Sequence, residues 1–394
     1  MLVFTFPGQG SQTSQMGRPW VDHPSWELVE EASIAVERDI GALLLDADQQ
    51  TLTETHNAQL ATFVLSMVVL DAVERLGIVP AYVAGHSLGE YSALCAAGAL
   101  GFEDAVGLVA ERGEAMRSAA EARTGSMSAV LGLDDDKVDA ACHRADGDVW
   151  VANFNAPGQV VIAGDPDAIA DAAAVATDLG AKRIMALDVS GAFHTPFMAP
   201  ARERLDKALA AVDMRTPSVP VIANVDALPH SDADSWPSLL GSQLSSPVRW
   251  RQSLQQLDDE GATTFLELGP GTVLTGTVKR TLRGSRRLSV DAPGQLDAAL
   301  EVLTNTPATE PDRHRGEHLH TSARLVVSPG SGLFTPGEVT EGTAVDAGDV
   351  IGLVGETEIR TPFSGSLMGL LALSGERISS SQPVAWLNAA VVAS

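Results

Sequence analysis

Cysteine is scarce in this chain of 394 residues, and long hydrophobic runs are missing. The two cysteines, Cys95 and Cys142, are too few for a disulfide framework, and their neighbours do not indicate a metal site. No uninterrupted apolar stretch reaches the ~18 residues that a membrane helix needs, and no basic region precedes the apolar residues after Met1. We therefore expect a cytoplasmic protein without a membrane span.

Positive charge is also in short supply. Lys and Arg number 26 against 51 Asp and Glu, so the formal net charge is −25. This balance argues against general binding to nucleic acid or to anionic membranes. One local basic cluster stands out: Lys279, Arg280, Arg283, Arg286 and Arg287. It is either a solvated helix end or a patch for an acidic partner.

The remaining composition is that of an ordinary globular protein, long enough for two or three domains. Residues 1–124 and 191–303 alternate apolar strands with helical stretches, which predicts an α/β-hydrolase-like parallel-sheet core with one strand over 219–226. Residues 125–190 interrupt this pattern with the order strand-helix-strand-strand-helix-strand, ending in a strand over 182–189. That order predicts an inserted ferredoxin-like subdomain.

The last quarter of the chain changes character. Residues 304–324 are polar and contain proline, which is typical of a linker. This segment contains three histidines: His314, His318 and His320. Without a carboxylate or cysteine scaffold they indicate a linker rather than a metal tract. Residues 325–394 have short strands, frequent turns and a weak internal echo between 328–334 and 361–367, which predicts a small β-sandwich with pseudo-twofold symmetry.

The strongest chemical signal is the sequence Gly85-His86-Ser87-Leu88-Gly89, a G-x-S-x-G frame between a predicted strand and a predicted helix. A serine hydroxyl becomes a nucleophile when a base lies within hydrogen-bond reach and donors await the oxyanion. The same frame also fits a strand–helix turn without chemistry. His194 is the best candidate base, because it follows a predicted strand, where sites gather in open α/β sheets.

Further segments occur in a fixed order with these two residues. They are GQGSQ (8–12), GHSLGEYSA (85–93), Arg112, NAPGQVVIAG (155–164), AFHTPFM (192–198), SSPVRW (245–250) and LELGPGTVLTG (266–276). Together they resemble the malonyl-CoA:acyl-carrier-protein transacylase family, including the acyltransferase domains of polyketide synthases. The resemblance covers about residues 1–300. One departure is Thr272, where related sequences often carry lysine.

The resemblance implies transfer of malonyl from malonyl-CoA to the phosphopantetheine thiol of acyl-carrier protein, without a cofactor and by a monomer. In this ping-pong scheme Ser87 carries the acyl group as an ester. His194 is the general base, and the backbone carbonyl of Gln243 orients it. The backbone N–H groups of Gln9 and Leu88 form the oxyanion hole.

Two residues of the resemblance bear on the substrate. Arg112 would grip the free carboxylate of malonyl through its planar guanidinium. Phe193, immediately before the base, accompanies malonyl selection in polyketide acyltransferases, because its ring fills the space that an α-methyl group needs. A pocket rejects one methyl group by only ~1–3 kcal/mol, so some leakage is expected.

Two other functions stay open on the sequence. A serine hydrolase would have the same nucleophile frame, but it usually orients its base with a carboxylate. The carboxylates between the serine and the histidine, such as Asp165, Asp167 and Asp188, fall in the predicted insert. A non-catalytic scaffold is the third possibility, and the combination of nucleophile, base and arginine counts against it.

Residues 325–394 resemble biotinyl/lipoyl carrier domains, which are barrel-sandwich hybrids that present a modifiable lysine on a hairpin. The last lysine of the chain is Lys279, and the corresponding turn reads Gly355-Glu356-Thr357-Glu358. We therefore predict the sandwich without biotin or lipoate. Its role is either to dock a partner protein or to stabilise the catalytic domain by packing.

Overall fold

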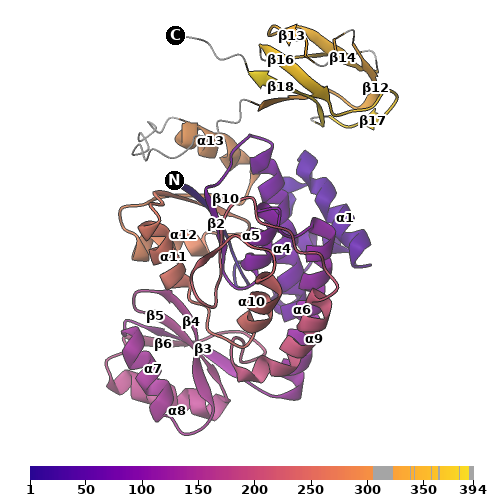
Figure 1. Cartoon of the computed structure of the whole chain (residues 1–394). Coiled ribbons are helices and arrows are strands. Elements are labelled where there is room, and N and C mark those ends of the chain that lie inside the picture. Colours follow the sequence, from indigo (N-terminus) through magenta and orange to yellow (C-terminus); the bar gives the residue numbers. More distant parts are fainter. Residues whose placement is uncertain are drawn as a thin grey trace. The chain divides into compact units, whose positions relative to one another are not determined.

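The computed structural model describes residues 1–304, 323–337, 339–340, 342–355, 357–362, 364–380 and 382–389. The chain forms two compact units, residues 1–307 and 308–394, drawn in Figure 1. Most of the predicted linker, with its three histidines, lies outside the described residues, as does Glu356 of the tail turn.

The first unit is built on a six-stranded sheet. Its strands, in spatial order, are β10 (Arg286–Val290), β9 (Thr264–Leu268), β1 (Leu2–Phe6), β2 (Tyr82–Gly85), β7 (Val221–Ile222) and β8 (Pro229–His230). All neighbours are parallel except β7 and β8. The carboxyl ends of β1 and β2 therefore meet at one edge of the sheet, which is where α/β sheets place their sites.

Helices cover this sheet. They are α1 (Glu27–Ala35), α2 (Ile40–Leu45), α3 (Gln49–Thr53), α4 (Thr55–Glu74), α5 (Gly89–Ala96), α6 (Phe102–Ala122), α9 (Ala199–Leu209), α10 (Trp236–Gln243), α11 (Trp250–Asp259), α12 (Val273–Thr281) and α13 (Leu296–Thr304). Short 3-10 helices lie at Arg18–Trp20, Pro24–Trp26, Pro196–Met198 and Pro293–Gln295. Helix α4 is long and apolar enough to cross a membrane, but 89% of its apolar window is buried inside the unit. It is therefore the core helix of this fold.

The insert is a second, smaller sheet with its own core. It consists of β3 (Ser126–Leu131), α7 (Asp135–Arg144), β4 (Val149–Ala156), β5 (Gln159–Gly164), α8 (Pro166–Asp178) and β6 (Arg183–Ala186). The strands lie in the order β4-β5-β3-β6 and all pairings are antiparallel. The backbone of Val248 donates to Ala152 and accepts from Phe154, both at 2.9 Å, so hydrogen bonds attach this sheet to the core.

Two predicted strands of the first unit are shorter than the sequence pattern indicates. The strand expected over 219–226 forms only Val221–Ile222, because the chain turns back at Ala227, whose φ is +63°, and pairs with β8. The strand expected over 182–189 ends at Ala186. Its remaining residues form a loop that reaches the site described below.

The second unit contains two four-stranded antiparallel sheets. One has the order β11 (Ala323–Val327), β18 (Pro383–Ala389), β16 (Gly365–Leu370) and β13 (Ala344–Val345). The other has the order β15 (Thr357–Arg360), β14 (Val350–Val354), β12 (Gly332–Pro336) and β17 (Arg377–Ile378). Residues of both sheets share one apolar core. The two sheets have equivalent strand orders: β11, β18, β16 and β13 of one correspond in turn to β15, β14, β12 and β17 of the other. The two segments of the sequence echo lead into the equivalent strands β12 and β16.

Candidate active site

Ser87 lies at the sharp turn between β2 and α5, with a positive φ of +54°. A Cβ atom at Gly85 would lie 1.9 Å from the backbone of Gly89, and one at Gly89 would lie 2.1 Å from the carbonyl oxygen of Phe6. Both glycines of the G-x-S-x-G frame are therefore required by close backbone packing. A non-glycine residue held in the left-handed region is strained, and such strain concentrates at functional sites.

The side chains of Ser87 and His194 meet across 107 residues of sequence. Ser87 Oγ lies 2.8 Å from His194 Nε2, and His194 Nδ1 lies 2.8 Å from the carbonyl oxygen of Gln243. Because a carbonyl only accepts, Nδ1 carries the proton and Nε2 is free to accept from the serine hydroxyl. Burial, and then the charge of Arg112, lower the pKa of His194 to about 3. The imidazole is therefore neutral in the resting site.

Arg112 of α6 is fully buried beside this pair. Its Nη2 donates to Ser87 Oγ at 3.0 Å and to Gln243 Oε1 at 2.9 Å, and its Nη1 donates to the side-chain oxygen of Gln59. All three acceptors are uncharged. A buried cation without an anionic partner is costly, and a planar guanidinium is suited to bind a carboxylate. The site therefore offers a place for a carboxylate next to the nucleophile.

The small catalytic pocket has a volume of about 150 Å³. The predicted residues Gln9, Ser87, Phe193 and His194 all line it. The other lining residues are Gln59, His86, Met116, Met127, Asn153, Asn155, Val161, Leu187 and Val189. Both the core and the insert contribute walls, so the pocket depends on how the insert is held. Phe193 is 5% exposed and is one of the apolar walls.

The predicted oxyanion residues lie on either side of the nucleophile. Leu88 directly follows Ser87 at the start of α5, and Gln9 follows β1. Across the described parts of the chain, neither backbone N–H forms a hydrogen bond within the protein. The Gln9 side chain accepts from Gln59 Nε2 at 3.2 Å, which ties this loop to α4. Both amides remain available to a ligand.

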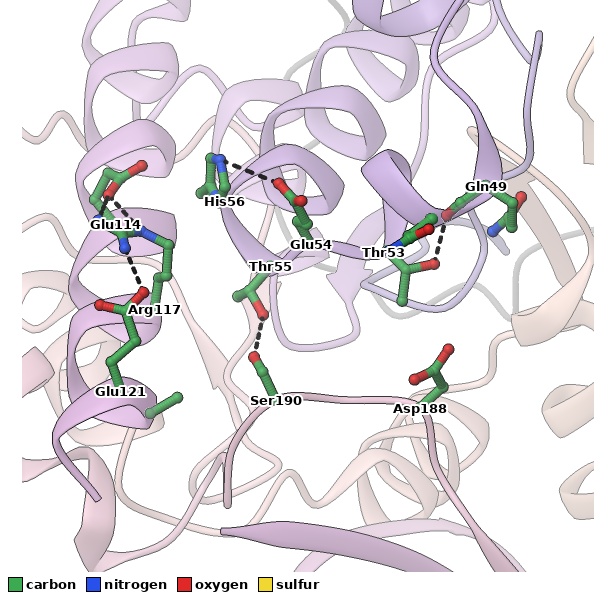
Figure 2. A pocket seen from close by; sticks show the side chains of 12 residues that line it. Gln49, Thr53, Glu54, Thr55, His56, Glu114, Arg117, Glu121, Asp188 and Ser190 are labelled. Carbon is green, nitrogen blue, oxygen red and sulfur yellow. Dashed lines mark hydrogen bonds and ion pairs between the residues drawn. The ribbon is translucent and has the colours of Figure 1, made fainter. Parts of the chain in front are cut away.

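Figure 2 shows a second and larger hollow, which has a volume of about 910 Å³. Its lining includes Thr55, Arg117 and Ser190 but not the nucleophile. Figure 2 shows Thr55 facing Ser190, whose oxygens lie 3.3 Å apart, and Arg117 paired with two glutamates of its own helix. Leu187 and Val189 line the catalytic pocket, whereas Asp188 and Ser190 line the hollow. The greater volume therefore does not coincide with the reactive groups.

Sequence reasoning missed three polar residues of the site: Gln59, Glu90 and Asn224. Asn224 Oδ1 accepts from the Ser87 N–H, and its Nδ2 donates to the Gly85 carbonyl, both at 2.7 Å. These bonds hold the nucleophile turn. The available signals were a glutamine inside the apolar run of α4, a glutamate within the GHSLGE segment, and an asparagine two residues after β7.

The basic cluster of the sequence is divided in the structure. Lys279, Arg280 and Arg283 line a separate hollow of about 540 Å³ with Pro157 and Gly276, and the other two arginines lie on β10. Thr272 immediately precedes α12. In the described ranges, no group of three or more His, Cys, Asp or Glu residues could hold a metal ion.

Comparisons with known proteins cover the same part of the chain. A family model described as acyl transferase domain matches residues 3–312. The malonyl CoA-acyl carrier protein transacylase of Bacillus subtilis is 41% identical over 307 residues, which are 77% of this chain and 97% of the relative. A crystal structure of an acyl carrier protein S-malonyltransferase from Vibrio cholerae is 39% identical, with a TM-score of 0.73, and covers 76% of this chain and 99% of its own.

A further solved structure shows a type II PKS acyl-carrier protein in complex with its malonyl-transacylase. It is 36% identical to this chain, has a TM-score of 0.74, and covers 76% of this chain and 99% of its own. Residues beyond 312 lie outside the family match.

Proposed function

This chain belongs to the acyl transferase domain family, and we propose that it transfers malonyl from malonyl-CoA to the phosphopantetheine thiol of acyl-carrier protein through an ester on Ser87. The observation that carries this proposal is the buried Arg112, which donates directly to the nucleophile oxygen. An enzyme acting on neutral esters has no need of a cation there. A malonyl group brings the carboxylate that this cation lacks.

In the first half-reaction, the Ser87 oxygen attacks the thioester carbonyl of malonyl-CoA while His194 Nε2 takes the hydroxyl proton. The N–H groups of Gln9 and Leu88 stabilise the oxyanion. When the tetrahedral intermediate collapses, the C–S bond breaks and the departing CoA sulfur receives the proton from the imidazolium. The Gln243 carbonyl holds Nδ1–H throughout, so the ring keeps one orientation.

In the second half-reaction, the phosphopantetheine thiol takes the place of CoA. His194 accepts the thiol proton, the sulfur attacks the malonyl ester, and the serine oxygen recovers a proton as it leaves. A carbonyl stabilises an imidazolium less than a carboxylate does. This weaker support is sufficient because a thiol is far more acidic than a serine hydroxyl and one thioester replaces another.

Arg112 also links substrate choice to the base. Its charge is the second cause of the lowered pKa of His194, after burial. A malonyl carboxylate paired with the guanidinium offsets this charge, so the base becomes stronger when the correct acyl group is bound. Phe193 would add a steric limit on the α-carbon of that group. No cofactor takes part in this scheme.

For the domain organisation, we propose a catalytic core at 1–124 and 191–303, a ferredoxin-like insert at 125–190, a linker at 304–324, and a barrel-sandwich hybrid at 325–394. The strand orders of the three four-stranded sheets support these assignments. The sequence contains no lysine after Lys279, so the sandwich has no residue for biotin or lipoate. It serves either as a docking module or as a packing partner. The cytoplasm is the expected location.

The test separates transfer from hydrolysis. Purified enzyme is mixed with malonyl-CoA, with and without phosphopantetheinylated acyl-carrier protein, and both free malonate and malonyl-carrier are measured. We expect malonyl-carrier to exceed free malonate by a wide margin. Release of malonate at the same rate with and without carrier would instead identify a hydrolase, and inertness toward malonyl-CoA would revive the scaffold hypothesis.

A further inference from the structure

Glu90 is a buried carboxyl group three residues beyond the nucleophile, and the mechanism above gives it no task. It lies on α5 and is 1% exposed. Its Oε1 accepts from the backbone N–H of Asn224 at 2.7 Å, and its Oε2 accepts from the side-chain amide of Gln243. A carboxyl group buried at this depth is costly to desolvate unless its bonds do something the site needs.

Gln243 connects Glu90 with the proposed catalytic residues. It is fully buried and is hydrogen-bonded to Ser87, His194 and Arg112. Its backbone carbonyl accepts from His194, its Oε1 accepts from Arg112 at 2.9 Å, and its Nε2 donates to the Ser87 carbonyl at 2.9 Å. One side chain thus connects the nucleophile turn with the arginine, and its backbone holds the base.

The direction of the Gln243 amide is fixed by its neighbours. Its NH₂ group faces two acceptors, the Ser87 carbonyl and Glu90, so the oxygen faces the Arg112 guanidinium. A rotation of the amide by half a turn would place N–H groups against the arginine and oxygen against two acceptors. The Ser87 carbonyl can accept from Gln243 only when the NH₂ group of the side-chain amide faces it. Glu90 is a second acceptor that favours the same orientation.

We propose that Glu90 is a positioning residue that fixes the Gln243 amide, and thereby the relative placement of Ser87, His194 and Arg112. This inference rests on the proposed malonyl transfer. Two acceptor oxygens face two N–H donors at Glu90, an arrangement that glutamine cannot reproduce because its own NH₂ would oppose one donor. Glu90→Gln therefore breaks one bond and invites the reversed amide of Gln243.

A matched control exists in the same unit. Glu267 on β9 is also 1% exposed, and its carboxyl also accepts from two N–H groups, those of Leu274 and Thr275 at the start of α12. It does not line the catalytic pocket. Glu267→Gln therefore reproduces the loss of a buried carboxylate without touching Gln243.

The experiment compares wild type, Glu90→Gln, Glu90→Asp and Glu267→Gln in the full chain. For each, rapid-quench mass spectrometry gives the rate of acyl-enzyme formation from malonyl-CoA and from acetyl-CoA, and circular dichroism gives the folded fraction. We expect Glu90→Gln to slow malonylation about 10- to 100-fold, the range that corresponds to a buried donor left without an acceptor. Its malonyl-to-acetyl preference falls as well, because the reversed amide opposes Arg112.

Glu90→Asp keeps two acceptor oxygens on a shorter side chain, so it should retain more activity than Glu90→Gln but lose part of the malonyl-to-acetyl preference. Glu267→Gln should keep wild-type rates per folded molecule. If Glu90→Gln is unfolded, the malonyl-to-acetyl preference of Glu90→Asp decides, since a merely structural residue would leave it unchanged. Wild-type preference in a folded Glu90→Gln or Glu90→Asp variant, or an equal loss in Glu267→Gln, would overturn the inference. A wild-type enzyme that forms no malonyl adduct would instead refute the proposed function.

Discussion

The two units of the molecule treat buried polar groups in opposite ways. In the first unit, Glu90, Arg112, His194 and Gln243 are buried together and hydrogen-bonded to one another or to the nucleophile turn. In the described residues of the sandwich, the buried polar side chains are Ser328 and Thr361, both uncharged. The contrast places the chemistry in the first unit, because buried ionisable groups are costly and persist where a function needs them.

Backbone strain follows the same division. Ser87 and His194 both have positive φ, at +54° and +61°. Among the described sandwich residues, positive φ occurs at glycines only. A strained nucleophile and a strained base therefore face each other in one unit, while the other unit has an unstrained frame. The sandwich is expected to act through its surface, and each prediction below tests this division.

Removing the buried cation should have the largest effect. Arg112→Ala takes away the partner of the malonyl carboxylate, so kcat/KM for malonyl-CoA should fall about 10²- to 10³-fold, as when one partner of a buried charge pair is lost. Acetyl-CoA, which has no such carboxylate, should lose much less. Kinetics with both thioesters checks this, and an unchanged malonyl preference would contradict the role of Arg112.

Replacing Phe193 should have a smaller effect, which is limited to the choice between acyl groups. Phe193→Ser opens space beside His194, and methylmalonyl-CoA should gain about tenfold relative to malonyl-CoA, within the ~1–3 kcal/mol that one methyl group commands. Competition between the two thioesters in one reaction measures the ratio. No gain for methylmalonyl-CoA would show that another wall of the pocket limits the α-carbon.

The buried carboxyl group of Glu90 should make the free energy of unfolding depend on pH. Burial raises the pKa of Glu90 to about 8, although Arg112 opposes the rise and Asp226 adds to it. Between the ordinary glutamate pKa and about 8, the folded protein keeps a proton that the unfolded chain has released, so stability falls as pH rises through this window. Glu90→Gln should flatten that slope by up to ~1 kcal/mol per pH unit. Urea unfolding at several pH values measures it, and equal slopes in both proteins would contradict the assignment.

Deleting the sandwich should have the smallest effect on chemistry. An enzyme ending at residue 312, the last residue of the family match, should transfer malonyl to a small thiol within about twofold of the full chain. Transfer to acyl-carrier protein then distinguishes the two roles of the sandwich. A selective loss with the carrier favours docking, whereas a loss with both acceptors, or insolubility, favours packing and would blur the division between the units.

The sequence predicted the residues that carry reactive atoms better than those that hold them. Ser87 lies in a local frame whose glycines are dictated by nearby backbone, so its signal is contained in five residues. Glu90, Asn224 and Gln243 form a network between residues more than a hundred positions apart, and only folding reveals it. Gln243 was assigned for its backbone carbonyl, and its side-chain contacts were not foreseen.

Fold prediction failed in a similar way at short elements. The strand expected over 219–226 looked long because its apolar residues continue past Ile222. The pairing with β2 nevertheless stops at Ile222, and Asn224 accepts from the Ser87 N–H instead. The strand expected over 182–189 ends early because Leu187 and Val189 are pocket walls. In both places the demands of the site shortened a regular element.

The most direct test of the account is the location of the acyl group. Wild-type enzyme and Ser87→Ala are mixed with malonyl-CoA, quenched on the millisecond scale, digested and mapped by mass spectrometry. We predict a malonyl ester on the Ser87 peptide that forms as fast as turnover and disappears when acyl-carrier protein is added, with no adduct in Ser87→Ala. A malonyl group on another residue, or turnover in wild type without any adduct, would contradict the central claim.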